Sequence, residues 1–382
     1  STPLYSSAAS DVYKRQLLGF AWIETRQWYP SPMGVIDPRA LQAYGVMIAF
    51  LSIGWEIARR ALRHIQRARE LWAELDPSLD RIVLAVLVVG QLLLAGIGVF
   101  PHVIAELTPS GANPAFYALA EGEHVWGEGA WLLLACSCMA LVLAFLRESS
   151  DSVESESRSP ISVVAFTLLA LTVPFLMAGR FAPELASASA LRWGLALVFL
   201  IGSAVAVFRE QLAGLGLKSL VSPWSPACLR GLLAGGAAIV LLLTMRVAAL
   251  GLSGLVPSGP IAESVFSEIG WTASVMVPLA MIVIGLAGTA LRERSSGYAF
   301  AGDLIWIATI AGGYALGVVT TGGALDATEQ VRGVLLAIAA GSVWSLAWLA
   351  VRTAERSSPH VSHARPLPGP RRFSAYPRTP GE

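Results

Sequence analysis

The chain alternates between long apolar stretches and short polar segments. Nine stretches approach the roughly 20 predominantly apolar residues that a transmembrane helix needs. They run near 41–58, 82–104, 129–146, 161–179, 191–208, 231–252, 271–291, 303–320 and 331–351. Because an open sheet cannot satisfy its backbone hydrogen bonds in lipid, such continuous runs predict helices. The pattern predicts an all-α, polytopic membrane helix bundle with about nine transmembrane helices.

Composition agrees with a lipid environment. Apolar residues make up 55% of the 382 residues and charged residues 14%, whereas soluble domains carry about 25% charged residues. Mean hydropathy is +0.62. The formal net charge of +1 gives no basic surplus for nucleic acid, and three cysteines are too few for a disulfide scaffold. We therefore expect the lipid bilayer as a partner and no nucleic acid; ligand and oligomeric state stay open.

The positions of lysine and arginine predict the orientation. When the loops are sorted alternately, one side holds 19 of these residues and the other holds five, leaving out Lys14, Arg15 and Arg246. Cytoplasmic loops carry the excess of positive charge. The sequence thus predicts a cytoplasmic C-terminus in a bacterial inner membrane.

Short matches recur in the same order and predict an internal duplication. Leu107–Gly111 (LTPSG) matches Leu255–Gly259 (LVPSG), and Val125–Trp131 shares a Glu-x-x-Trp element with Val265–Trp271. A unit of four spans returns the chain to its starting side, so both units keep one orientation. The predicted boundaries are 41–180 for the first four-helix repeat unit, 181–328 for the second and 329–353 for an extra transmembrane helix.

The two ends of the chain are expected to lie outside this bundle. Residues 6–16 (SSAASDVYKRQ) resemble the in-frame translation of a transposase-type sequencing adapter. That resemblance implies that 1–16 are an artefact and that the chain is a fragment. Because 17–40 precede the first helix of a repeat unit, they are expected to be the remnant of a truncated helix and its outer loop. Residues 354–382, rich in proline and arginine, predict a disordered basic cytoplasmic tail.

The outer loop between the second and third spans carries candidate polar chemistry. Glu121, Glu123, His124 and Glu128 lie within eight residues there. The Glu121-x-Glu123 pair resembles the acidic element in the first outer loop of membrane glycosyltransferases that use lipid-linked sugars. In those enzymes the element follows the first span, whereas here it follows the second predicted one. A solvated acidic loop is the alternative.

Three other charged residues are candidates. Glu128 and its repeat counterpart Glu268 each precede a tryptophan by three residues, where a carboxylate in a first helical turn is stabilised by the helix dipole. Contact with a ligand at the outer face is the functional alternative. Arg246 lies inside a predicted span and is a candidate intramembrane charge. Its alternative is snorkelling to the headgroups.

No recognisable catalytic motif is present: the sequence lacks a phosphate loop, Gly-x-Ser-x-Gly, and His-Glu-x-x-His. We therefore expect no cofactor and no metal, and favour a non-enzyme. The leading hypothesis is a transport-like or scaffold-like multi-pass membrane protein. Two alternatives are a membrane-embedded transferase acting on a lipid-linked substrate at the outer face, and a structural or assembly protein.

Overall fold

The computed structural model describes residues 38–62, 78–108, 127–151, 161–214, 225–253 and 264–357, with a few isolated residues at 16–27 and at 65. Every regular element within these ranges is a helix. The predicted adapter segment 1–16, most of 17–37 and the tail beyond residue 357 lie outside them. The predicted all-α class is confirmed.

The long helices coincide with the predicted spans, although several begin earlier. They are α2 (Pro38–Ala61), α4 (Ser78–Glu106), α5 (Glu128–Asp151), α6 (Ile161–Arg180), α7 (Ser187–Val207), α9 (Ser225–Leu252), α11 (Trp271–Glu293), α12 (Ser296–Thr320) and α13 (Ala327–Ser357). Three short helices also occur: η4 (Ala182–Glu184), α8 (Arg209–Gly214) and α10 (Val265–Glu268).

Eight of the long helices are apolar enough over a sufficient length to cross a membrane. The chain is therefore a multi-pass integral membrane protein. The ninth predicted span lies in α5, whose apolar part, Glu128–Ala144, is shorter. With 24 residues and a rise of about 1.5 Å per residue, α5 is about 36 Å long, so its length alone would cross a hydrocarbon core of about 30 Å.

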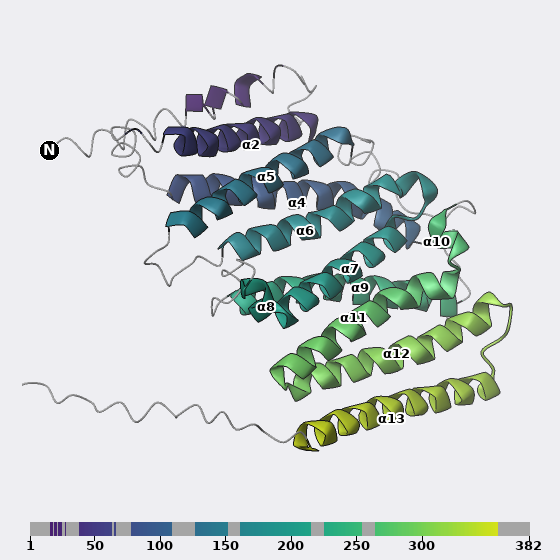
Figure 1. The fold of residues 1–382 in the computed structure, drawn as a ribbon. Helices are drawn as coiled ribbons and strands as arrows, with labels where there is room; N and C mark the ends of the chain where they lie inside the picture. The colour runs from purple at the N-terminus through teal and green to yellow at the C-terminus, as the bar shows by residue number, and fades with distance from the viewer. Residues whose placement is uncertain are drawn as a thin grey trace, which may run out of the picture.

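The helices form a layered row (Figure 1), in which α2 packs parallel to α5 and α7 packs parallel to α11, since their matching ends contact each other. α2 and α5 pack together at one edge, α4, α6, α7, α9 and α11 form the middle, and α12 and α13 form the other edge. On one side of the bundle, at the helix ends, Arg60 of α2 donates a hydrogen bond to α5, and Arg209, Arg230 and Arg292 form ion pairs between α8, α9 and α11. We name this side of the bundle the arginine-rich end and the other side the opposite end.

The main hydrophobic core fills the middle of the row. Leu195, Val240 and Ile282 lie near the midpoints of α7, α9 and α11, and each is less than 2% exposed. Burial falls toward the α13 edge: the most apolar part of α6 is 61% buried within the protein, whereas that of α13 is 6% buried. The remaining faces of α13 are apolar and suit contact with lipid.

Small residues allow the middle helices to approach closely. A Cβ on Gly194 of α7 would lie 2.9 Å from the Cβ of Pro174 and 3.0 Å from its backbone Cα. Pro174 stands inside α6, where proline removes a backbone hydrogen bond. The glycine therefore lets α7 pack directly against the proline turn. The predicted duplication of four-helix units stays a prediction, because the packing gives no test of it.

Candidate functional site

Part of the predicted outer-face site lies outside the described residues, namely Glu121, Glu123 and His124. Glu128 is exposed and is the first residue of α5, the position expected for a carboxylate that stabilises a helix start. Glu268 is also exposed, but it belongs to the short α10. Gly270, with φ +88°, separates α10 from α11. Glu268 therefore lies in the first turn of a helix, as expected, but that helix is the short α10 and not the long α11.

The two glutamates lie on elements that are far apart in the row. Glu128 begins α5, and Glu268 ends α10 beside α11, while α6 and α7 stand between these two parts of the bundle (Figure 1). The described residues therefore do not bring the repeated glutamates into one site.

Arg246 lies on the exposed side of α9 near the opposite end. Its Nε donates a hydrogen bond to the carbonyl oxygen of Leu107, just beyond the end of α4, at 3.3 Å. The helix continues only to Leu252. This position supports the snorkelling interpretation, because the long side chain reaches polar backbone at a helix end.

A partly buried glutamate near a buried arginine, at the opposite end, was missed by the sequence analysis. Glu106, at the end of α4, accepts hydrogen bonds from the backbone N–H groups of Ser187 and Ala188 at 2.8 and 2.9 Å. These N–H groups begin α7 and have no partner inside that helix. Arg192, one turn further along α7, is 1% exposed and attracts Glu106 electrostatically. The pair therefore joins α4 to α7.

The guanidinium of Arg192 has further partners on its own helix. Its Nε donates to the carbonyl of Ala188 and its Nη2 donates to the hydroxyl of Ser189, both at 3.3 Å. Glu106 lies at the end of α4 and Arg192 lies near the start of α7. Because both positions adjoin loops, the sequence pattern alone assigns their charges to the loops. Only the packing of α4 against α7 shows that they meet.

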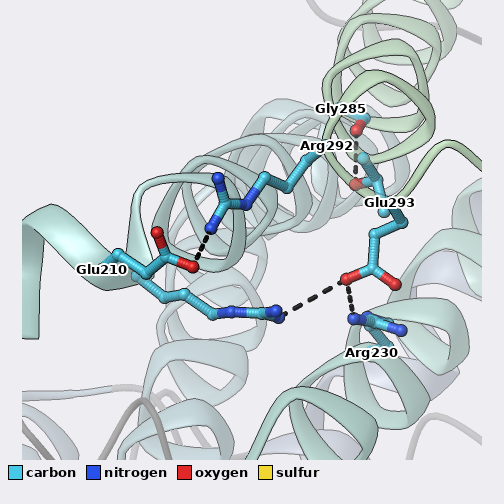
Figure 2. A network of polar contacts seen from close by, with 7 residues as sticks. Glu210, Arg230, Gly285, Arg292 and Glu293 are labelled. Carbon is cyan, nitrogen blue, oxygen red and sulfur yellow. Dashed lines mark hydrogen bonds and ion pairs between the residues drawn. The ribbon is translucent and has the colours of Figure 1, made fainter. Parts of the chain in front are cut away.

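Ion pairs connect three helices at the arginine-rich end. Figure 2 shows Glu293 of α11 paired with Arg230 of α9. Glu293 also pairs with Arg209, at the start of α8. The Arg209 Nη1 lies 3.4 Å from the Glu293 Oε1. The adjacent Arg292 turns the other way and pairs with Glu210. Since these side chains are partly exposed, the cluster is best explained as a clamp between helix ends.

A cavity of about 400 Å³ lies next to this clamp, between α11, α12 and α13. Its lining combines charged, aromatic and small polar side chains. The lining includes Arg294, Ser295, Ser296, Phe300, Asp303, Trp344, Ser345, Trp348, Leu349 and Arg352. Apolar and cationic groups therefore share one hollow at the arginine-rich end.

A tight turn positions one wall of this cavity. α11 ends at Glu293, and Arg294 adopts a left-handed conformation with φ +52°. Ser295 is extended and caps α12 without a side-chain hydrogen bond. The first backbone N–H groups of α12 have no carbonyl partner within their helix. Uncapped N–H groups and two arginines therefore border the cavity.

Two tryptophans of α13 form the opposite wall. The indole Nε1 of Trp344 donates to the carbonyl of Ala299 at 3.1 Å. A Cβ on Gly302 would lie 2.9 Å from the Trp344 ring, so this glycine is what lets the indole lie against α12. The centroids of the Trp344 and Trp348 rings are 6.2 Å apart.

Asp303 adds a carboxylate to the same cavity. It lies seven residues into α12, about 10 Å along the helix from Ser296. Its Oδ1 is buried and has no hydrogen-bond partner among the residues that the structure describes. The predicted span began at residue 303, whereas α12 begins at Ser296. The sequence analysis therefore overlooked this carboxylate inside a span.

Within the described ranges, no group of three histidine, cysteine or acidic residues could hold a metal ion. Comparison with known proteins adds no assignment: no family model, no curated protein and no solved structure matches the chain.

Proposed function

We propose that the protein is a scaffold-like membrane protein that holds a phospholipid in the cavity between α11, α12 and α13. The single observation that carries the proposal is the lining of that cavity. Arg294, Arg352 and the uncapped start of α12 suit a phosphate, since helix N-termini and arginines both bind anions. Trp348, Phe300 and Leu349 offer apolar surface for an acyl chain.

The packing of the remaining helices supports a scaffold-like role over a transport-like one. Secondary transporters place their substrate site near the bilayer midplane, at discontinuous helices. Here the midpoints of α7, α9 and α11 hold fully buried apolar side chains. Glu106–Arg192 at one end and the Glu293 clamp at the other fix the helices relative to one another. The middle of the row therefore acts as a rigid support for the α12–α13 edge.

The same proposal includes an orientation. The arginine-rich end faces the cytoplasm of a bacterial inner membrane, because positive charge is retained on that side. Basic pockets between transmembrane helices on the cytoplasmic side suit anionic groups of lipids. The transferase alternative would use Glu121, Glu123 and Glu128; it stays a prediction, because Glu121 and Glu123 lie outside the described residues.

Native mass spectrometry of the detergent-purified protein tests the proposal. We expect phospholipid to remain bound to the wild-type protein and to be lost from Ser345→Trp, because Ser345 lines the cavity and an indole would fill it. Ser342→Trp is the matched control, since Ser342 is an exposed serine one turn earlier on α13 and outside the lining.

Equal phospholipid retention by Ser345→Trp and Ser342→Trp would show that the cavity is not the lipid site. Substrate flux through proteoliposomes of the wild-type protein would instead favour the transport-like hypothesis.

A further inference from the structure

We infer that the phospholipid held in the α11–α12–α13 cavity carries a net negative charge and an uncharged hydroxyl headgroup, as phosphatidylglycerol does. This inference rests on the proposed function and names the ligand class of the same site. Its basis is that positive charge gathers at the mouth of the cavity, where α11 and α13 end and α12 begins, whereas the carboxylate of Asp303 lies deeper.

Arg352 supplies the binding cation at the mouth. It is exposed near the end of α13, and it makes no ion pair or hydrogen bond with the residues that the structure describes. Arg294 lines the same cavity but already interacts within the protein, so its main contribution is to the positive potential around a bound anion. A guanidinium holds a phosphate through charge-assisted hydrogen bonds. We therefore assign the lipid phosphate to Arg352.

The face of α13 that lines the cavity sets the depth of the headgroup. Trp344, Trp348 and Arg352 follow one another at intervals of four residues, which places them on the same side of the helix. All three line the cavity, with Arg352 nearest the helix end. A phosphate at Arg352 keeps the glycerol backbone of the lipid beside the indoles, which favour the boundary between headgroups and hydrocarbon.

Exposed apolar side chains continue from the cavity toward the hydrocarbon core. Phe300 and Leu304 of α12 are 63% and 52% exposed, and Leu349 of α13 is 59% exposed. A cavity of about 400 Å³ accommodates a headgroup but not two acyl chains. The chains therefore lie along the outer faces of α12 and α13.

The charge of the lining favours an anionic lipid over a zwitterionic one. Arg294 and Arg352 against Asp303 are two positive charges and one negative, a net charge of +1. Phosphatidylglycerol neutralises that charge, whereas phosphatidylethanolamine has no net charge and leaves it in place. The ammonium group of the second lipid would also lie close to the arginines and be repelled by them. The Oδ1 of Asp303 is buried and out of its reach.

Two serines at the start of α12 suit a hydroxyl headgroup. Ser295 makes no side-chain capping hydrogen bond, and Ser296 is the first residue of the helix. Both line the cavity. Serine hydroxyls donate and accept hydrogen bonds, as do the hydroxyls of a glycerol headgroup. Such a headgroup therefore finds partners at the mouth without bringing a second cation beside the arginines.

Competition between two lipids tests the inference. The delipidated protein is offered equimolar phosphatidylglycerol and phosphatidylethanolamine with identical acyl chains, and native mass spectrometry gives the ratio of the bound species. We expect the wild-type protein to favour phosphatidylglycerol about fivefold, because one basic residue near the membrane surface attracts an anionic lipid by about 1 kcal/mol. Arg352→Gln should reduce that preference to less than about twofold.

Arg332→Gln is the matched control. Arg332 is an arginine of the same helix at the opposite end, where it is 61% exposed and pairs with Glu329. The substitution removes the same charge from the chain, and an exposed ion pair contributes little to stability. This variant should therefore fold and keep the wild-type preference. Thermal unfolding of both variants shows whether a changed preference comes from misfolding.

Asp303→Asn changes the charge of the lining in the other direction. It removes the negative charge that opposes the arginines, so it should keep or raise the preference for phosphatidylglycerol. A fall in that preference would show that the carboxylate itself binds the headgroup, which would overturn the inference independently of Arg352.

The two proposals fail in different ways. If the wild-type protein binds both lipids equally, or if Arg352→Gln keeps the full preference for phosphatidylglycerol, the anionic inference is overturned and the phospholipid site stands. If the wild-type protein retains neither lipid, or binds inorganic phosphate in place of lipid, the proposed function fails and the inference fails with it.

Discussion

Glu106→Gln tests the charged pair at the junction of α4 and α7. The carboxylate accepts two backbone N–H bonds, at 2.8 and 2.9 Å, from the start of α7. A glutamine offers one oxygen to these two donors and turns its own NH₂ group toward the other. One hydrogen bond to a charged group is lost, a change of about 1.5–3 kcal/mol.

The substitution also leaves Arg192 without its counter-charge. Arg192 is 1% exposed and attracts Glu106 over a longer distance than an ion-pair contact, so this loss is smaller than the loss of about 3–5 kcal/mol on breaking a contacting buried ion pair. Hydrogen bonds between transmembrane helices are weaker, about 0.6 kcal/mol on average. Because Glu106 lies at a helix end and bonds backbone at a helix start, we expect about 3 kcal/mol. That is roughly a hundredfold change in the unfolding equilibrium constant.

Unfolding by SDS in mixed micelles, followed by far-UV circular dichroism, gives the required free energies. Glu128→Gln is the control, since this exposed glutamate also lies at a helix terminus, and it should change the stability by less than about 0.5 kcal/mol. A double-mutant cycle with Arg192→Met should show positive coupling, because removing both charges leaves neither one uncompensated. Equal effects of the two glutamate substitutions, or strict additivity in the cycle, would refute the reasoning.

Three further predictions concern packing, the ion-pair clamp and orientation. Gly194→Ala should destabilise the protein by about 1–3 kcal/mol in the same SDS titration, because its Cβ would meet Pro174. Gly90→Ala is the control; it has open space around it and should be neutral or stabilising by up to about 1 kcal/mol. A larger destabilisation by Gly90→Ala than by Gly194→Ala would contradict the packing. Glu293→Gln should lower the free energy of unfolding more than Glu210→Gln does in that titration. Glu293 pairs with Arg209 and Arg230, whereas Glu210 pairs with one arginine and is 64% exposed. Equal losses of stability would show that the clamp contributes little. The orientation can be tested in a variant with its three cysteines replaced. Ser296→Cys, at the proposed cytoplasmic end of α12, should react with a membrane-impermeant maleimide only after the cells are permeabilised, whereas Thr321→Cys, at the other end, should react in intact cells. The opposite labelling would show the opposite orientation.

Hydropathy predicted the spans well because lipid imposes one simple requirement on each of them. A helix such as α6 must be long and apolar whichever neighbours it has, and its predicted and observed bounds nearly coincide. The start of α12 was placed at Asp303, too late, because Ser296, Gly297 and Gly302 lower the hydropathy of its first turns. The prediction therefore put Asp303 at the start of a span, although it lies seven residues inside the helix.

Side-chain partnerships could not be predicted from the sequence in the same way. Glu106 and Arg192 are 86 positions apart and meet only because α4 ends beside the start of α7. Trp344 reaches Ala299 because Gly302 leaves space for an indole. The repeated Glu128 and Glu268 looked equivalent in sequence, yet Gly270 separates the second one from its long helix. Such outcomes depend on the packing of pairs of helices, which a pattern along one chain does not contain.

The attachment of α13 has a mechanical consequence. This helix packs mainly on α12, through the bonds from Trp306 to Ala340, from Trp344 to Ala299 and from Tyr314 to Glu329. In atomic force microscopy, a cantilever pulling on the C-terminal end would apply force to those few contacts first. The helix α13 should therefore leave the bilayer as a separate early event. The interlocked α6, α7 and α11 would resist until later, at higher force.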